Sequence, residues 1–301
     1  MRVSTSYMHQ SAIDAILKQQ SKLSETQTQV STGEKIQSSA DDPIAAVKSL
    51  GLNRELNLTK QYLANADTAD TKLINTDSVL SSATDILQRI RELAVKGLSD
   101  TNDAQARQAI ASEMTELNET LVGLANSEDS NGEYIFSGYQ TGTEAFDATT
   151  FAYNGDSGQR SIRIADSYSV EINESGDDVF ISTTVGGTTQ SVFQTIQDFT
   201  NALNSGTVGT APNDGDFLSN MDTSMDLVAI ARTRIGAQQN AIEQQRSVNE
   251  DIKFNLESTL SDLEALDYAE AISLLSLQST ALEASQASYV KVQSLSLFNY
   301  L

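Results

Sequence analysis

The stretch ADDPIAAVKSL, residues 40–50, predicts the start of the longest helix in the chain. Asp42 can accept hydrogen bonds from the free N–H groups of a first helical turn, and Pro43 suits the first helical position, which needs no N–H. Apolar side chains then recur every three or four residues, and the sevenfold positions include Leu73, Leu80 and Leu87. This pattern predicts a helix over residues 43–97, about 75 Å long at ~1.5 Å per residue.

The same periodicity predicts further helices on both sides of a different central region. Their expected ranges are 10–31, 104–126, 191–204, 217–266 and 268–297. The first of these has two Gln on its seam, so we do not expect it to form a strong zipper alone. Because neither terminal seam is covered locally, the N- and C-terminal parts are expected to pair with each other as an elongated, antiparallel, coiled-coil-like bundle.

The central region changes character to short, partly alternating segments with turn residues between them. We expect strands within 132–139, 151–156, 160–173 and 178–183. The aromatic residues there are expected to form the core of a small domain; they include Tyr134, Phe136, Tyr139, Phe151 and Tyr153. The predicted fold class is therefore mainly α with an inserted β-rich domain.

Three domains are expected from these patterns. The first is a terminal helical domain of residues 1–40 and 267–301. The second is a long-helix bundle of residues 41–130 and 215–266. The third is the β-rich insert, residues 131–214.

Composition excludes several classes of function. The net charge is −22, and between Asn126 and Asp226 sixteen Asp and Glu face only Arg160 and Arg163. An acidic chain without a basic stripe argues against nucleic acid and against anionic membrane surfaces as partners. The first 30 residues contain no continuous apolar segment typical of a secretory signal, so any export is expected to leave the N-terminus uncleaved.

The sequence offers no residue on which to base an enzyme. His9 is the only His, and Cys is absent, so nucleophilic catalysis has no base beside a thiol. Asp41 and Asp42 are interpreted as a helix cap, and Asp177 with Asp178 as a turn. No EF-hand loop or phosphate-binding glycine loop is present, so we expect no catalytic residue, no cofactor and no metal.

The terminal segments instead predict self-assembly. Their seams mix Gln, Ser and Ala with Leu, so two helices alone would form a thin core. Many copies packed together would bury more apolar area, at roughly 25 cal/mol per Å². The residues expected at this assembly interface are Ile13, Ile16, Leu17, Leu23, Val30, Leu274, Leu277, Leu295, Leu297, Phe298, Tyr300 and Leu301.

Both ends of the chain resemble the flagellin superfamily. The N-terminal match is VSTGEKIQSSADDPIAAV (30–47), and the C-terminal match is LDYAEAISLLSLQSTALEASQASYVKVQSLSLFNYL (266–301). Within the superfamily, the chain resembles the hook–filament junction proteins. The residues that carry this finer resemblance are Asp41, Asp42 and Pro43, the SLFNYL ending, and LANSEDSNGEYIFSGYQTGTEAF (124–146) with Tyr134, Phe136 and Gly138.

The resemblance implies a structural subunit at the boundary between hook and filament, outside the cell. It implies a ring of subunits that contacts hook-associated protein 1 on one side and flagellin on the other. It also implies export through the flagellar type III apparatus, and a cytosolic chaperone that binds the C-terminal region beforehand.

Two other functions stay open. A flagellin-type filament subunit is the nearest alternative, and an adhesin that acts through the β-rich insert is the next.

Overall fold

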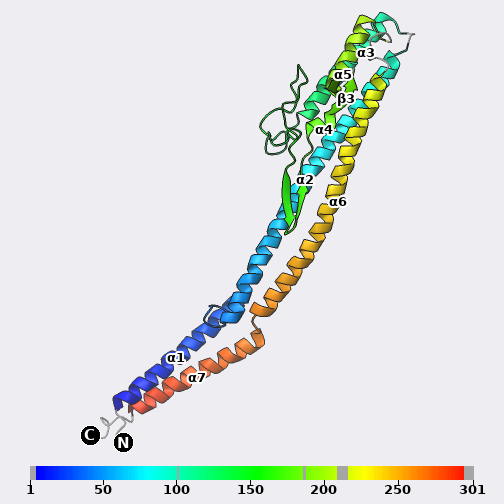
Figure 1. Ribbon diagram of the computed structural model, residues 1–301. Coiled ribbons are helices and arrows are strands. Elements are labelled where there is room, and N and C mark those ends of the chain that lie inside the picture. Colours follow the sequence, from blue (N-terminus) through cyan, green and yellow to red (C-terminus); the bar gives the residue numbers. More distant parts are fainter. Residues whose placement is uncertain (1–4, 100–101, 186–187, 209–215, 295–301) are drawn as a thin grey trace. The chain divides into compact units, whose positions relative to one another are not determined.

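A computed structural model describes residues 5–99, 102–185, 188–208 and 216–294 (Figure 1). It is 72% helical with a small strand region, which confirms the predicted mainly α fold class. The chain divides into two units, Met1–Leu58 with Ile252–Leu301, and Thr59–Asp251. The three-domain division stays a prediction.

The first unit contains an antiparallel helix pair. Helix α1 (Thr5–Thr32) lies beside α7 (Tyr268–Ser294), drawn in blue and red in Figure 1. The His9 ring lies 5.8 Å from that of Tyr289, and Gln19 donates to the carbonyl of Gln278. Residue numbers in α7 fall as those in α1 rise, so the two helices run in opposite directions, as predicted.

Helix α2 (Pro43–Gly97) has the bounds that the sequence predicts. Asp42 Oδ1 accepts hydrogen bonds from the backbone N–H groups of Ile44 and Ala45, at 3.1 and 3.0 Å. Asp41 Oδ2 accepts from the N–H of Ser38 at 2.8 Å and so closes the preceding loop. The interpretation as a helix cap is therefore confirmed for Asp42, whereas Asp41 accepts from the loop before the helix.

The second unit packs long helices and the insert around one continuous core. Helices α3 (Ala104–Ala125), α5 (Val192–Ser205) and α6 (Phe217–Glu264) join α2 here. The buried cluster runs without a break from Leu73 of α2 and Met114 of α3 to Phe193 of α5 and Val228 of α6. Ion pairs between α2 and α6 join Asp77 to Arg232 and Arg91 to Asp222, so these helices also run antiparallel.

In the described residues, the regular strands only partly coincide with the segments that the sequence suggests. Strands β1 (Ser161–Ala165) and β2 (Tyr168–Glu171) form one antiparallel hairpin, within the expected 160–173. Strands β3 (Ile181–Val185) and β4 (Thr188–Ser191) form a second, separate hairpin.

Three of the expected strands need correction. Residues 132–139 and 151–156 hold only isolated bridges, Glu128 to Tyr134 and Phe146 to Tyr153. Turns and bends occupy most of 132–139, whereas 151–156 is irregular outside its bridge. The range 178–183 divides between a short helix, α4 (Gly176–Phe180), and the start of β3. Ser175 caps this helix by accepting from the N–H of Asp177, so the Asp177–Asp178 pair lies in a first helical turn.

Candidate assembly interface

The predicted interface residues of the first unit are largely uncovered. Leu17 is 57% exposed and Leu277 is 66% exposed, while Ile13 and Leu274 are also exposed. Ile16, Leu23 and Val30 are half-buried. Leu295, Leu297, Phe298, Tyr300 and Leu301 lie outside the described residues. The interface stays a prediction.

The contact between α1 and α7 explains why so much apolar surface is left outside. Thr26 of α1 and Gln278 of α7 are buried, and the Gln278 side-chain oxygen has no hydrogen-bond partner. A groove of about 330 Å³ between the helices is lined by Ala12, Ala15, Ala284, Ser285, Ser288 and Tyr289. Small and polar side chains thus line this groove, while Leu17 and Leu277 remain mostly exposed.

The sequence prediction did not include a second group of exposed apolar residues. Ile44, Val47 and Leu50 of α2 are 83%, 73% and 73% exposed, and Phe254 of α6 is 72% exposed. A spacing of three keeps neighbours in the row on one side of the helix. The sequence does contain a signal for these residues: a short apolar row follows the Asp42–Pro43 cap, beside the main apolar face of the helix.

The motif residues of the insert have structural roles that can be stated. Phe136 is fully buried and meets Phe180 edge-on at 5.4 Å, while Phe146 meets Phe193 at 4.9 Å. Gly138 has a positive φ of 71°, and a Cβ there would meet the backbone oxygen of Asp156.

Two of the insert tyrosines differ from each other. Tyr153 is half-buried, as expected for a core residue, and its hydroxyl donates to the carbonyl of Asp156 at 2.8 Å. The expectation that Tyr139 is a core residue is wrong: its side chain is 63% exposed. Its ring covers Gly158, and its hydroxyl donates to the carbonyl of Gln159 at 2.9 Å, so it lies over the loop from outside.

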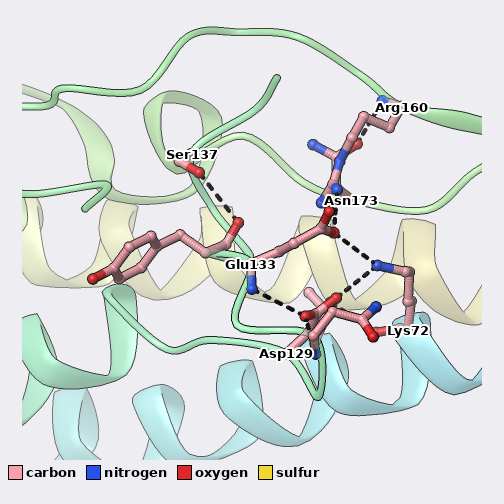
Figure 2. A network of polar contacts seen from close by, with 9 residues as sticks. Lys72, Asp129, Glu133, Ser137, Arg160 and Asn173 are labelled. Atoms are coloured by element: carbon pink, nitrogen blue, oxygen red, sulfur yellow. Dashed lines mark hydrogen bonds and ion pairs between the residues drawn. The ribbon is translucent and has the colours of Figure 1, made fainter. Parts of the chain in front are cut away.

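A network of charged side chains joins the insert to α2 (Figure 2). Lys72 Nζ lies 2.6 Å from Asp129 Oδ2 and 3.1 Å from Glu133 Oε2. Arg160 Nη1 lies 2.8 Å from the same Glu133 oxygen. The backbone of Arg160 also donates to Asn173 Oδ1 at 2.6 Å. One lysine of the helix thus binds Glu133 of the insert and Asp129 of the segment between α3 and the insert.

This network changes the proton affinity of both carboxylates. Hydrogen bonds from Arg160 and then Lys72 lower the pKa of Glu133. Burial acts to raise the pKa of Asp129, but hydrogen bonds from Lys72 and from the backbone N–H groups of Asn131 and Glu133 outweigh it, so the pKa is lowered. Both groups are therefore held in the charged form, as expected for a structural connection.

The described residues contain neither a metal-binding cluster nor a membrane-spanning helix. No group of three or more His, Asp or Glu gathers there in a way that could hold a metal ion. Nor is any helix in the described parts of the chain both long and apolar enough to cross a bilayer.

Comparison with known proteins matches residues 3–141 to the bacterial flagellin N-terminal helical region. Flagellar hook-associated protein 3 of Escherichia coli (strain K12) is 29% identical over 99% of this chain and 99% of that protein. The crystal structure of flagellar hook-associated protein 3 from Legionella pneumophila covers 70% of this chain and 98% of its own, with a TM-score of 0.65 and 19% identity. A flagellin of Clostridium tyrobutyricum is 28% identical over only 40% of this chain and 32% of that flagellin.

These matches define the class of protein that the chain resembles: residues 3–141 match a bacterial flagellin region, and the relatives are structural flagellar proteins. Along its whole length, it is similar to flagellar hook-associated protein 3.

Proposed function

We propose that this chain is the structural subunit that joins the flagellar hook to the flagellin filament. The observation that carries the proposal is the extent of the similarity. Hook-associated protein 3 of Escherichia coli aligns over 99% of both chains, whereas the flagellin of Clostridium tyrobutyricum aligns over less than half of each. A filament subunit is the alternative, because residues 3–141 match a flagellin region.

The proposed partners follow from this place in the flagellum. Copies of the chain would form a ring, with hook-associated protein 1 on the hook side and flagellin on the filament side. Before assembly, a cytosolic chaperone would cover the C-terminal region, and the flagellar type III apparatus would export the chain without cleaving a signal peptide.

The exposed side chains of α1 and α7 support self-association. Leu17 and Leu277 are each more than half exposed, so a neighbouring copy that covers them removes apolar area from water. The gain is roughly 25 cal/mol per Å², and it is repeated at every subunit of a closed ring. We therefore assign these helices, with the proposed terminal domain of residues 1–40 and 267–301, to contacts between subunits.

Complementation of a deletion strain tests the proposal. The strain is expected to secrete flagellin without attaching a filament, and the intact gene is expected to restore swimming. Labelled antibody is expected to mark a thin zone between hook and filament. A deletion strain that still carried full filaments and swam, or label along the whole filament, would refute the junction role and favour the filament subunit.

A matched pair of variants tests the proposed interface. Leu277→Glu places a charge on the exposed face of α7 and should reduce filament attachment at least tenfold, because the charge would have to be buried between subunits. Ile230→Glu is the control, since Ile230 of α6 is comparably exposed at 55% but lies outside the proposed interface. Equal attachment by both variants would show that α7 does not contact a neighbour.

A further inference from the structure

Glu174 is a buried carboxylate that the proposed assembly does not use. Its side chain is 2% exposed, and its Oε2 lies 2.7 Å from Nη1 of Arg234, which is itself 40% exposed. Arg234 belongs to α6, whereas Glu174 belongs to the insert, between β2 and α4. A carboxylate enclosed in this way has lost most of its water and retains one partly hydrated cation as its ion-pair partner.

Residues 172–176, which include Glu174, form hydrogen bonds with the rest of the insert. Residues 172–176 are all buried. Asn173 donates to the carbonyl of Gly158 at 3.0 Å, and the N–H of Gly176 donates to the carbonyl of Phe136 at 2.8 Å. The hydroxyls of Ser175 and Tyr153 lie 3.1 Å apart. The neighbours of Glu174 therefore face the insert, while its own carboxylate reaches across to α6.

Charges from three elements act on Glu174. Arg234 from α6 favours the carboxylate form, while Asp178 of α4 and Glu171 of β2 oppose it. Burial is the largest influence, and together these effects raise the pKa of Glu174 to about 7. The carboxyl group thus exchanges its proton near neutrality, far above the range of an ordinary glutamate.

We propose that Glu174 and Arg234 form a pH-dependent connection between residues 172–176 and α6, which holds the insert more firmly in mildly acidic than in alkaline medium. Below neutrality, the buried group is a neutral acid that needs no counter-ion. Above neutrality, it is an enclosed anion between two further carboxylates, stabilised by Arg234.

The sign and size of the effect follow from proton linkage. A carboxyl group whose pKa is higher in the folded than in the unfolded state contributes stability that is fully present below the unfolded pKa. That contribution is lost as the pH rises through the folded pKa. With values of 4.5 and about 7, the equilibrium constant for opening this connection rises about tenfold between pH 6 and pH 8.

Hydrogen exchange of the full chain tests the proposal. After correction for the intrinsic exchange rate, protection of the amides in residues 172–180 is expected to fall about tenfold from pH 6 to pH 8. In Glu174→Gln, which keeps the size of the side chain and carries no titrating group, the fall should disappear. Equal pH dependence in the two proteins would overturn the proposal.

Carbon-detected NMR of the Glu174 carboxyl provides the second measurement. A midpoint near pH 7 is expected, and a midpoint between pH 4 and 5 would overturn the proposal. Asp178→Asn removes an opposing charge from an exposed position and should lower the midpoint, whereas Arg234→Gln should raise it. If Arg234→Gln fails to fold, Asp178→Asn decides: a midpoint that does not move refutes the assigned charges.

Discussion

The substitution Gly138→Ala probes how closely the insert loops approach each other. Gly138 has a φ of 71°, a left-handed conformation that alanine adopts only with strain. An added Cβ would meet both the backbone oxygen and the carboxylate of Asp156. These atoms cannot move freely: the carboxylate accepts from the N–H of Tyr139 at 2.8 Å, and the backbone oxygen accepts from Tyr153.

The expected cost is the sum of two effects less a small gain. The left-handed conformation costs alanine about 1–2 kcal/mol. Forcing an extra carbon into a filled space costs about 1–3 kcal/mol. Replacing glycine lowers the conformational entropy of the unfolded chain, which stabilises the folded state by about 0.4–1 kcal/mol. We therefore expect Gly138→Ala to lower the free energy of unfolding by about 3 kcal/mol.

Two further glycines in the same unit separate these effects. Gly132 has a φ of 75°, but the nearest atom to an added Cβ is 3.9 Å away, so Gly132→Ala should cost only about 1 kcal/mol. Gly123 lies within α3 with nothing within 4 Å of an added Cβ, so Gly123→Ala should stabilise by about 0.8 kcal/mol.

Urea denaturation of the full chain, followed by circular dichroism, measures the three differences. The midpoints should rank Gly123→Ala above the unmodified protein, then Gly132→Ala, then Gly138→Ala, with similar slopes. If Gly138→Ala were no less stable than Gly132→Ala, the close approach to Asp156 would be wrong.

Further predictions concern the polar contacts between the insert and the helices. Because the pKa values of Asp129 and Glu133 lie below their ordinary values of 3.8 and 4.5, their contribution to stability is present above about pH 4.5 and is lost as the pH falls further. Thermal unfolding between pH 3 and 6 should show this loss, and Lys72→Met should weaken it; an unchanged acid limb would contradict the network of Figure 2. Asn249 is buried in α6 and donates to the carbonyl of Ile164 in β1 at 2.9 Å, so Asn249→Ala should cost about 1–3 kcal/mol. Amide exchange of β1 should accelerate in that variant, and unchanged protection would show that the bond does not hold the strand.

The helix bounds could be predicted from the sequence because capping residues and apolar spacing act over a few neighbouring residues. The Asp42–Pro43 pair stops the loop and starts α2, and the spacing of Leu and Ala continues it to Gly97. Side chains of one helix turn can satisfy the backbone and define the apolar stripe without help from distant residues. The same reasoning placed α3 within one residue of its observed end and α5 within one residue at each end.

The backbone conformation of the insert could not be predicted in the same way, because its N–H and C=O groups form hydrogen bonds with residues of other loops. Residues 132–139 alternate like a strand, yet the N–H of Tyr134 donates to the carbonyl of Thr141, and Gly138 turns the chain. Their hydrogen bonds go to turns and neighbouring loops rather than to a strand ladder. The aromatic residues thus identified buried positions such as Phe136, but the pattern did not identify the backbone conformation.

By itself, the sequence determined the mainly helical class, the start of α2 and the resemblance at both ends to the flagellin superfamily. Only the tertiary structure decided that the insert shares one core with α2, α3 and α6, and that Leu17 and Leu277 remain uncovered beside a seam of small residues. The physical reason is the range of the forces. Helix propensity and capping act within a few residues, whereas burial of Glu174 or exposure of Leu277 depends on what the rest of the chain places beside it.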